Sequence, residues 1–140
     1  MEESLNFLSD ISAQEVRTLS PLVTAHIGDA YFHLYTRTRL LKVTHRINNL
    51  HELSAKIVSA ISQAEAYKNI ENFLTDDERE IFRRGRNAKT HAPRSSTVKE
   101  YHASTGFEAL LGELFLTKKF SRLDEICAAA FNSIFEEMAT

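Results

Sequence analysis

The amino-acid sequence predicts an all-α protein with about five to seven helices and no strands. Long stretches repeat apolar residues at steps of three and four, which is the spacing of one face of a helix. Capping-box pairs, in which Ser or Thr is followed three residues later by Glu, mark where some of these stretches begin. No stretch alternates apolar and polar residues as a half-buried strand would.

The N-terminal part of the chain predicts two helices. Ser12 and Glu15 have capping-box spacing and predict the start of the first helix. Pro21 fits the first turn of the second helix, because the backbone N–H that proline lacks would have no partner there. This proline opens a long amphipathic run that we expect to end at about Leu41.

The middle of the chain predicts one long helix and one short helix. Apolar residues recur at helical steps from Leu53 to about Ile70, so we expect a single helix over this stretch. Thr75 and Glu78 form a second capping box, and Gly85 suits the C-terminal end of the short helix that follows.

The C-terminal part predicts a loop and two further helices. Residues 87–97 carry a proline and several Ser and Thr without periodicity, which indicates an exposed loop. Helical spacing returns over residues 101–116. Ser121 with Asp124 predicts the N-terminal cap of a last amphipathic helix that runs to about Met138.

Length and composition are typical of a single globular domain spanning residues 1–140, with 43% hydrophobic residues available for one core. Cys127 is the single cysteine, which excludes an intramolecular disulfide, and its apolar neighbours indicate a small buried residue. No apolar run reaches the roughly 18 residues of a membrane span, and the first ten residues are unlike a signal or transit peptide. We therefore expect a cytoplasmic protein that does not associate with membranes.

Two acidic residues stand in apolar stretches with helical spacing, Asp29 in AHIGDAYFHLY and Glu108 in STGFEALLGELFL. A carboxylate on an apolar face loses hydration, which is costly unless a cation or hydrogen-bond donors compensate. Gly28, Gly106 and Gly112 lie beside these acids and would allow two helix backbones to approach closely. Although a single glycine of this kind is usually incidental, the three together predict that the two acids meet and share a cation.

Positive charge is concentrated in one segment, although the net charge of the chain is −2. The segment from Arg83 to Lys99 carries six Lys or Arg residues and no acid. Such a cluster is usually a solvated surface, but it is also the electrostatic signature of a site that receives phosphate groups.

A competing hypothesis places a transition metal on a single helix. His26, Asp29 and His33 follow at i, i+3 and i+7 and share one helical face, a geometry that could hold zinc or iron. Histidines in such triples are more often structural, and the sequence alone leaves both alternatives open.

Four motifs identify a family resemblance. IGDA at 27–30, VSAISQA at 58–64, RRGRNAK at 83–89 and STGFEALLGELFL at 104–116 stand in the order and spacing of Mini-ribonuclease III, the short branch of the ribonuclease III family. The resemblance covers about residues 19–123, and RRGRNAK followed by STGFEAL at this separation is its most specific part.

The resemblance implies a ribonuclease III-like endonuclease domain that forms a symmetric homodimer and hydrolyses double-stranded RNA with Mg²⁺, leaving 5′-phosphate ends. It implies that Asp29 and Glu108 are the catalytic carboxylates and the metal ligands. Three further acids of full-length ribonuclease III are replaced, by Leu22, Ala25 and Thr105, as expected of the Mini branch. Magnesium often uses only one or two protein carboxylates, so two acids suffice.

The resemblance also implies a substrate and its contacts. The expected substrate is the precursor of large-subunit (23S) ribosomal RNA, bound without a separate double-stranded-RNA-binding domain and with the help of a ribosomal protein. Double-stranded RNA is recognised mostly by its shape and charge, so the expected RNA-binding residues are those of the basic segment: Arg83, Arg84, Arg86, Asn87, Lys89 and Arg94. The alternative, suggested by the missing acids, is a non-catalytic helical RNA-binding or ribosome-associated module.

Overall fold

The computed structural model describes residues 6–8, 11–88 and 97–139, and every regular element in these ranges is a helix. This confirms the all-α prediction. The α-helices are α1 (Ala13–Thr18), α2 (Pro21–Leu40), α3 (Ile47–Ile57), α4 (Ala60–Ile70), α5 (Asp76–Arg86), α6 (Val98–Leu116) and α7 (Phe120–Ala139), and two short 3₁₀ helices are η2 (Asn6–Leu8) and η3 (Glu71–Phe73).

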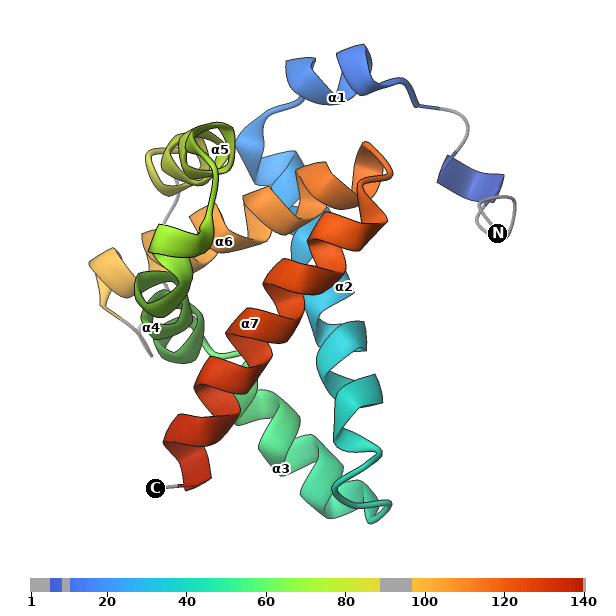
Figure 1. Ribbon diagram of the computed structural model, residues 1–140, viewed down its shortest axis with the longest axis vertical. Coiled ribbons are helices and arrows are strands. Elements are labelled where there is room, and N and C mark those ends of the chain that lie inside the picture. Colours follow the sequence, from blue (N-terminus) through green and yellow to red (C-terminus); the bar gives the residue numbers. More distant parts are fainter. Residues whose placement is uncertain (1–5, 9–10, 89–96, 140) are drawn as a thin grey trace.

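Helix α6 is the centre of the fold. It packs against α1, α2, α4, α5 and α7 (Figure 1). Phe107, Leu110 and Leu111 of this helix have no exposed surface, and Cys127 of α7 is equally buried, as predicted. The apolar faces of the other helices surround α6 because each can remove its hydrophobic stripe from water only against a neighbour. Of the helices that the structure describes, none has the length and apolar character that crossing a membrane requires.

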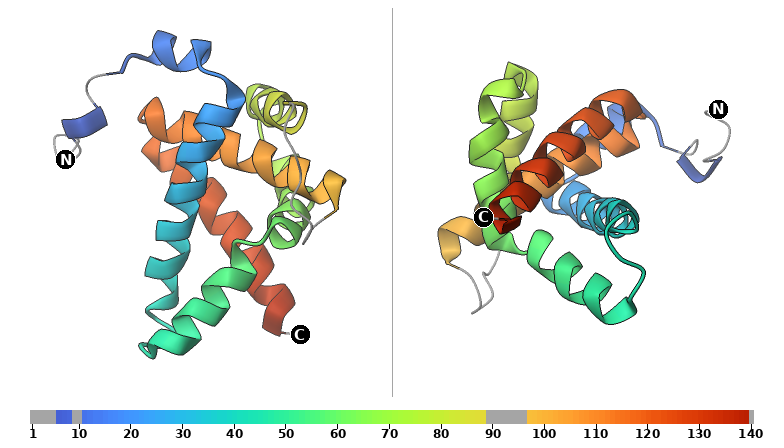
Figure 2. Two further views of the ribbon diagram at one scale, coloured as in Figure 1. Left: turned by 180° about the vertical axis from the view of Figure 1, so that it is seen from behind. Right: turned by 60° about the horizontal axis from the view of Figure 1, so that its bottom comes forward.

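Helices α2 and α6 touch backbone to backbone. A Cβ atom at Gly28 of α2 would overlap the carbonyl oxygen of Glu108 and come within 2.8 Å of the Gly112 nitrogen. A Cβ atom at Gly112 would in turn overlap the carbonyl oxygen of Thr24. Only glycine fits at these two positions, because any side chain would push the helices apart. Figure 2 shows α2 lying across α6 when the molecule is seen from behind.

A second glycine pair brings α5 against α6. A Cβ atom at Gly85 would lie 2.9 Å from the Cα of Gly106 and 2.8 Å from the Cβ of Ala109. A Cβ at Gly106 would meet the carbonyl oxygen of Phe82 at 2.6 Å. Gly85 is therefore a packing residue within α5. Its predicted role at the helix end is wrong, since α5 continues to Arg86 in ordinary helical geometry.

The single long helix predicted over residues 53–70 is also wrong. The chain forms α3 and α4, with a break at Val58 and Ser59. The Ser59 hydroxyl accepts a hydrogen bond from the Ser62 backbone N–H, which caps the start of α4. Because serine at this position satisfies a helix N-terminus, a new helix begins where the apolar spacing alone suggests continuity.

The predicted capping boxes at Ser12 and Thr75 are both present. A third one, formed by Thr97 and Glu100, begins α6 three residues earlier than the apolar spacing indicates. The predicted cap at Ser121 is wrong, because α7 begins at Phe120, after a turn in which Lys118 has a φ of 63°.

A buried ion pair ties α5 to α7. Both oxygens of Glu78 accept hydrogen bonds from Arg122, each at 2.8 Å, and Arg122 also donates to the Phe73 carbonyl. This pairing with Arg122 is the main reason that the pKa of Glu78 lies below its ordinary value. The two-pronged contact between Arg122 and Glu78 thus links the start of α5 to α7.

We predict that Gly28→Ala lowers the free energy of unfolding by about 3 kcal/mol or more, because the added methyl group meets backbone atoms of α6 that cannot move aside. In a helix without this crossing the same change would stabilise the protein by roughly 1 kcal/mol. Urea denaturation followed by circular dichroism measures the difference.

Ala30→Ser is the matched control, since Ala30 is exposed on the same helix. We expect it to change the unfolding free energy by less than about 1 kcal/mol. A Gly28→Ala variant at least as stable as wild type would contradict the close backbone crossing.

Candidate active site

Asp29 and Glu108 lie together where α2 crosses α6. Gly28 is in contact with the Glu108 backbone, and Asp29 is the next residue along α2. The Asp29 side chain is 51% exposed, whereas Glu108 is largely buried. The carboxyl groups are near enough for Glu108 to hydrogen-bond to Asp29 when Glu108 carries a proton. The structure thus places the two acids side by side, with Asp29 half exposed and Glu108 largely buried.

The pKa of Glu108 is raised to about 8. Burial is the largest cause, because it removes the water that stabilises the charged carboxylate. The negative charge of Asp29 and the hydrogen bond between the two acids raise it further, while a hydrogen bond from Gln63 lowers it. The pair therefore prefers to hold a proton near neutral pH, and a cation beside it would remove that preference.

Two neighbouring side chains contact the acids. The Nε2 group of Gln63 on α4 donates to Glu108 Oε2 at 3.2 Å and to the Val58 carbonyl at 2.9 Å. On α2, His33 Nε2 lies 3.3 Å from Asp29 Oδ1. Each acid thus has its own polar partner, and the four side chains come from α2, α4 and α6.

Gln63 was not among the site residues predicted from the sequence. It lies within the VSAISQA motif, but no role was expected for it. Gln63 shares the buried face of α4 with Ala66, Tyr67 and Ile70, and it is the polar member of that set. An amide at a position where the helical spacing demands an apolar residue was the signal that could have identified it.

The transition-metal hypothesis finds no support. Among the residues that the structure describes, no group of three or more His, Cys, Asp or Glu is placed to hold a metal ion. His26 is exposed, and His33 is a hydrogen-bond partner of Asp29. The three residues share a helical face without converging on a point.

The positions of the three replaced acids carry no ligand for a hard cation. Leu22 is 38% exposed, Ala25 is buried, and the Thr105 hydroxyl donates to the Tyr101 carbonyl within α6. Two adjacent carboxyl groups, one buried and one open to solvent, still suit an oxygen-preferring ion such as Mg²⁺, which keeps several waters and binds one or two carboxylates.

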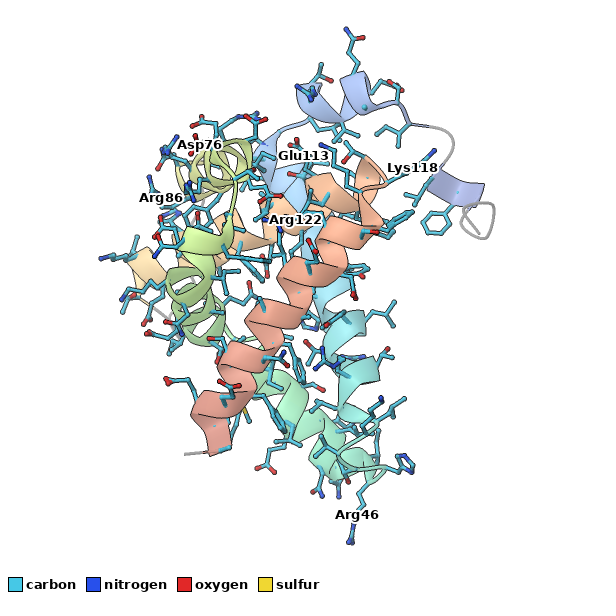
Figure 3. All side chains as sticks on the ribbon, in the orientation of Figure 1. Arg46, Asp76, Arg86, Glu113, Lys118 and Arg122 are labelled. Atoms are coloured by element: carbon cyan, nitrogen blue, oxygen red, sulfur yellow. The ribbon has the colours of Figure 1, made fainter. Side chains whose placement is uncertain are left out.

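The basic residues that the structure describes are on the surface at the end of α5. Arg83, Arg84, Arg86 and Asn87 are all exposed, and Arg86 projects outward in Figure 3. Arg83 pairs with Glu80, and Arg86 lies over the Phe82 ring and donates to Asn87. The other two predicted RNA-binding residues, Lys89 and Arg94, lie outside the described residues.

The packing of α5 relates these residues to the acids. Gly85, between Arg84 and Arg86, crosses α6 at Gly106, and Glu108 lies two residues further along α6. The basic end of α5 and the carboxyl pair are therefore fixed to the same stretch of one helix.

Comparison with known proteins identifies the family of the chain. The model of the Ribonuclease III domain family matches residues 22–119, which include both acids and the basic end of α5. The chain is 42% identical to Mini-ribonuclease 3 of Thermoanaerobacter sp. (strain X514), over 97% of this chain and 100% of that protein. It is 40% identical to Mini-ribonuclease 3 of Staphylococcus aureus, over 79% of this chain and 86% of that protein.

A solved structure shares the fold. The X-ray crystal structure of a Fusobacterium nucleatum protein superimposes with a TM-score of 0.76 at 34% sequence identity, covering 85% of this chain and 97% of that one. Ribonuclease III enzymes cut double-stranded RNA and generally use divalent metal ions. The chain belongs to the ribonuclease III family, in its Mini-ribonuclease III branch, and is an endoribonuclease.

Proposed function

We propose that this protein is a Mg²⁺-dependent endoribonuclease in which Asp29 and Glu108 are the catalytic carboxylates and the metal ligands. The observation that supports this most directly is the placement of these two acids side by side, at a point where burial and mutual repulsion raise the pKa of Glu108 to about 8. Such a pair is stabilised by a divalent cation more than by any neutral neighbour.

The two acids would divide the work according to their surroundings. Asp29 is half exposed and accessible to hydrated ions and to RNA. Glu108 is enclosed and held by Gln63, so its carboxylate keeps one orientation. Bound Mg²⁺ would supply a water of lowered pKa and would polarise the scissile phosphate. In-line attack by water on the phosphorus would break its bond to the 3′ oxygen, which would take up a proton, and would leave 5′-phosphate and 3′-hydroxyl ends.

Backbone recognition of the RNA is assigned to Arg83, Arg84, Arg86, Asn87, Lys89 and Arg94. The exposure of the four that the structure describes supports this role, because guanidinium and amide groups on a surface can reach phosphate oxygens. The anchoring of α5 on α6 supports it as well, since it holds these charges in a constant relation to the carboxyl pair.

The physiological role that we propose is maturation of the 23S ribosomal RNA precursor in the cytoplasm. Residues 1–140 would act as one catalytic domain in a homodimer whose two sites cut both strands, with a ribosomal protein helping to present the RNA. The likeness to Mini-ribonuclease 3 proteins supports this proposal. Sequencing the ribosomal RNA termini that accumulate in cells without the protein tests it, and unchanged 23S termini would contradict it.

We predict that Asp29→Asn and Glu108→Gln each reduce RNA cleavage by about 10³-fold or more, since each removes a charge that the metal requires. Helical content and molecular mass in solution should stay as in wild type. Cleavage of a double-stranded RNA in Mg²⁺, with an EDTA control, measures the effect. Normal turnover in either variant would remove that residue from the mechanism.

We predict that the metal-free protein becomes less stable as pH rises from about 4.5 to about 8. The unfolded chain releases the Glu108 proton near 4.5 and the folded protein near 8, so ionisation favours the unfolded chain across this window. Glu108→Gln lacks this ionisable group. Its free energy of unfolding, compared with that of wild type, should therefore rise by roughly 2–4 kcal/mol between pH 4 and pH 8.

Urea denaturation in EDTA at the two pH values measures this difference. At pH 8, added Mg²⁺ should restore the free energy of unfolding that the wild-type protein loses in EDTA. It should leave the free energy of unfolding of Glu108→Gln nearly unchanged. Parallel pH profiles for the two proteins in EDTA would show that Glu108 ionises as freely in the folded state as in the unfolded one.

We predict that replacing Arg84 and Arg86 together by Gln weakens double-stranded RNA binding and lowers the slope of log affinity against log salt by up to about 2. The measurement uses the Asp29→Asn background, in which the RNA stays intact. Replacing Arg37 and Arg46 by Gln is the matched control, because both are exposed and Arg46 lies at the opposite end of the molecule (Figure 3). Equal salt slopes for the two double variants would show that Arg84 and Arg86 contribute no more to RNA binding than other surface arginines.

A further inference from the structure

Gln63 is an amide buried inside the helical core without a complete set of partners. Its side chain has no exposed surface. Both Nε2 contacts are made, to Glu108 and to the Val58 carbonyl. Its Oε1 atom has no hydrogen-bond partner among the described residues. Buried polar atoms are nearly always paired, so an unpaired amide oxygen beside a carboxyl pair calls for a physical reason.

Turning the amide over would not remove the problem. Oε1 would then face the Val58 carbonyl oxygen, which is also an acceptor, and, with Glu108 ionised as it would be beside a cation, a second acceptor at Glu108 Oε2. The arrangement with Nε2 toward Glu108 is the one that suits a charged carboxylate. It leaves Oε1 as a buried acceptor without a donor among the described residues.

The position of Oε1 limits what that donor can be. Oε1 shares a carbon atom with Nε2, which is 3.2 Å from Glu108 Oε2, so a single water molecule can span from Oε1 to the carboxyl pair. A water bound to a divalent cation is a strong donor, and magnesium keeps several such waters. Outer contacts of this kind orient ligands in metal sites.

The break between α3 and α4 places Gln63 there. The Val58 carbonyl lies at the end of α3, where the helix leaves it without an internal partner, and Gln63 supplies one from the first turn of α4. The same amide group therefore links the helix junction to Glu108. Because α4 packs against α6, the position of Gln63 relative to α6 is fixed.

We propose that Gln63 is a positioning residue for the divalent-ion site: its Nε2 group holds the Glu108 carboxylate toward Asp29, and its Oε1 accepts a hydrogen bond from a water of the ion. This inference rests on the proposed function of the carboxyl pair. Gln63 does not touch the reacting phosphate in this scheme. It acts through Glu108 and through the hydration shell of the ion.

The decisive variant is Gln63→Met, which keeps the length of the side chain and removes both polar atoms. Mn²⁺ is the probe, because its binding to the RNA-free protein can be titrated by electron paramagnetic resonance. We expect Mn²⁺ affinity to fall about tenfold or more. We also expect kcat to fall at low Mg²⁺ and recover at high Mg²⁺, with KM for RNA unchanged.

Controls separate this role from a merely structural one. The melting temperature of Gln63→Met in EDTA should stay within about 5 °C of wild type. Gln14→Leu changes the chain's other glutamine, which is exposed on α1, and should behave as wild type throughout. Gln63→Leu repeats the titration if the Met variant does not fold.

The outcomes distinguish the two proposals. Wild-type protein that binds no Mn²⁺, or a Glu108→Gln variant that binds it equally well, would overturn the ion site and with it the role of Gln63. Wild-type binding that is lost in Glu108→Gln and unchanged in Gln63→Met would overturn the role of Gln63 alone.

Discussion

The backbone contact between α2 and α6 is the constraint on which the rest of the structure depends. Gly28 and Gly112 let the two helices approach until main-chain atoms touch. This separation is shorter than any pair of side chains would allow. It fixes how far Glu108 is buried and how close it lies to Asp29. Burial first, and repulsion from Asp29 second, then raise the pKa of Glu108. The close packing at the two glycines therefore also determines the electrostatics of the two acids.

The surroundings of the two acids give them different properties. Asp29 meets solvent and His33, while Glu108 is enclosed and meets Gln63. An enclosed acid is well oriented but holds a proton at neutral pH, whereas an exposed acid is accessible but less constrained. Under the proposed function, one acid of each kind would combine access for an ion with a fixed carboxylate direction.

Much of the fold follows from local rules. Apolar spacing and capping boxes identify α1, α2, α5 and most of α6, since these helices obey propensity and pattern together. The division between α3 and α4 escapes such reasoning, because Ser59 is a moderate helix former whose capping role depends on the path of the preceding turn. The role of Gly85 was predicted wrongly for a similar reason. A glycine is required there by the close contact with α6, which is remote in sequence.

The candidate site was accessible to sequence reasoning only in part. The meeting of Asp29 and Glu108 is expected because isolated acids on apolar faces need compensation and glycines lie beside them. Gln63 could not be assigned, since a buried amide has many possible partners and only the tertiary structure shows which one it has. The sequence left open whether His33 is a metal ligand or a structural partner of Asp29, because a shared helical face does not show where side chains turn.

The seating of α5 through Gly85 has an evolutionary consequence. Because α5 meets α6 through its main chain at Gly85, the neighbouring Arg84 stays exposed on the outer side of the last turn. Arg84 can be exchanged for another residue without disturbing the core, whereas Gly85 cannot. Selection can thus change the side chain at the surface of α5 while the helix packing beneath it stays intact.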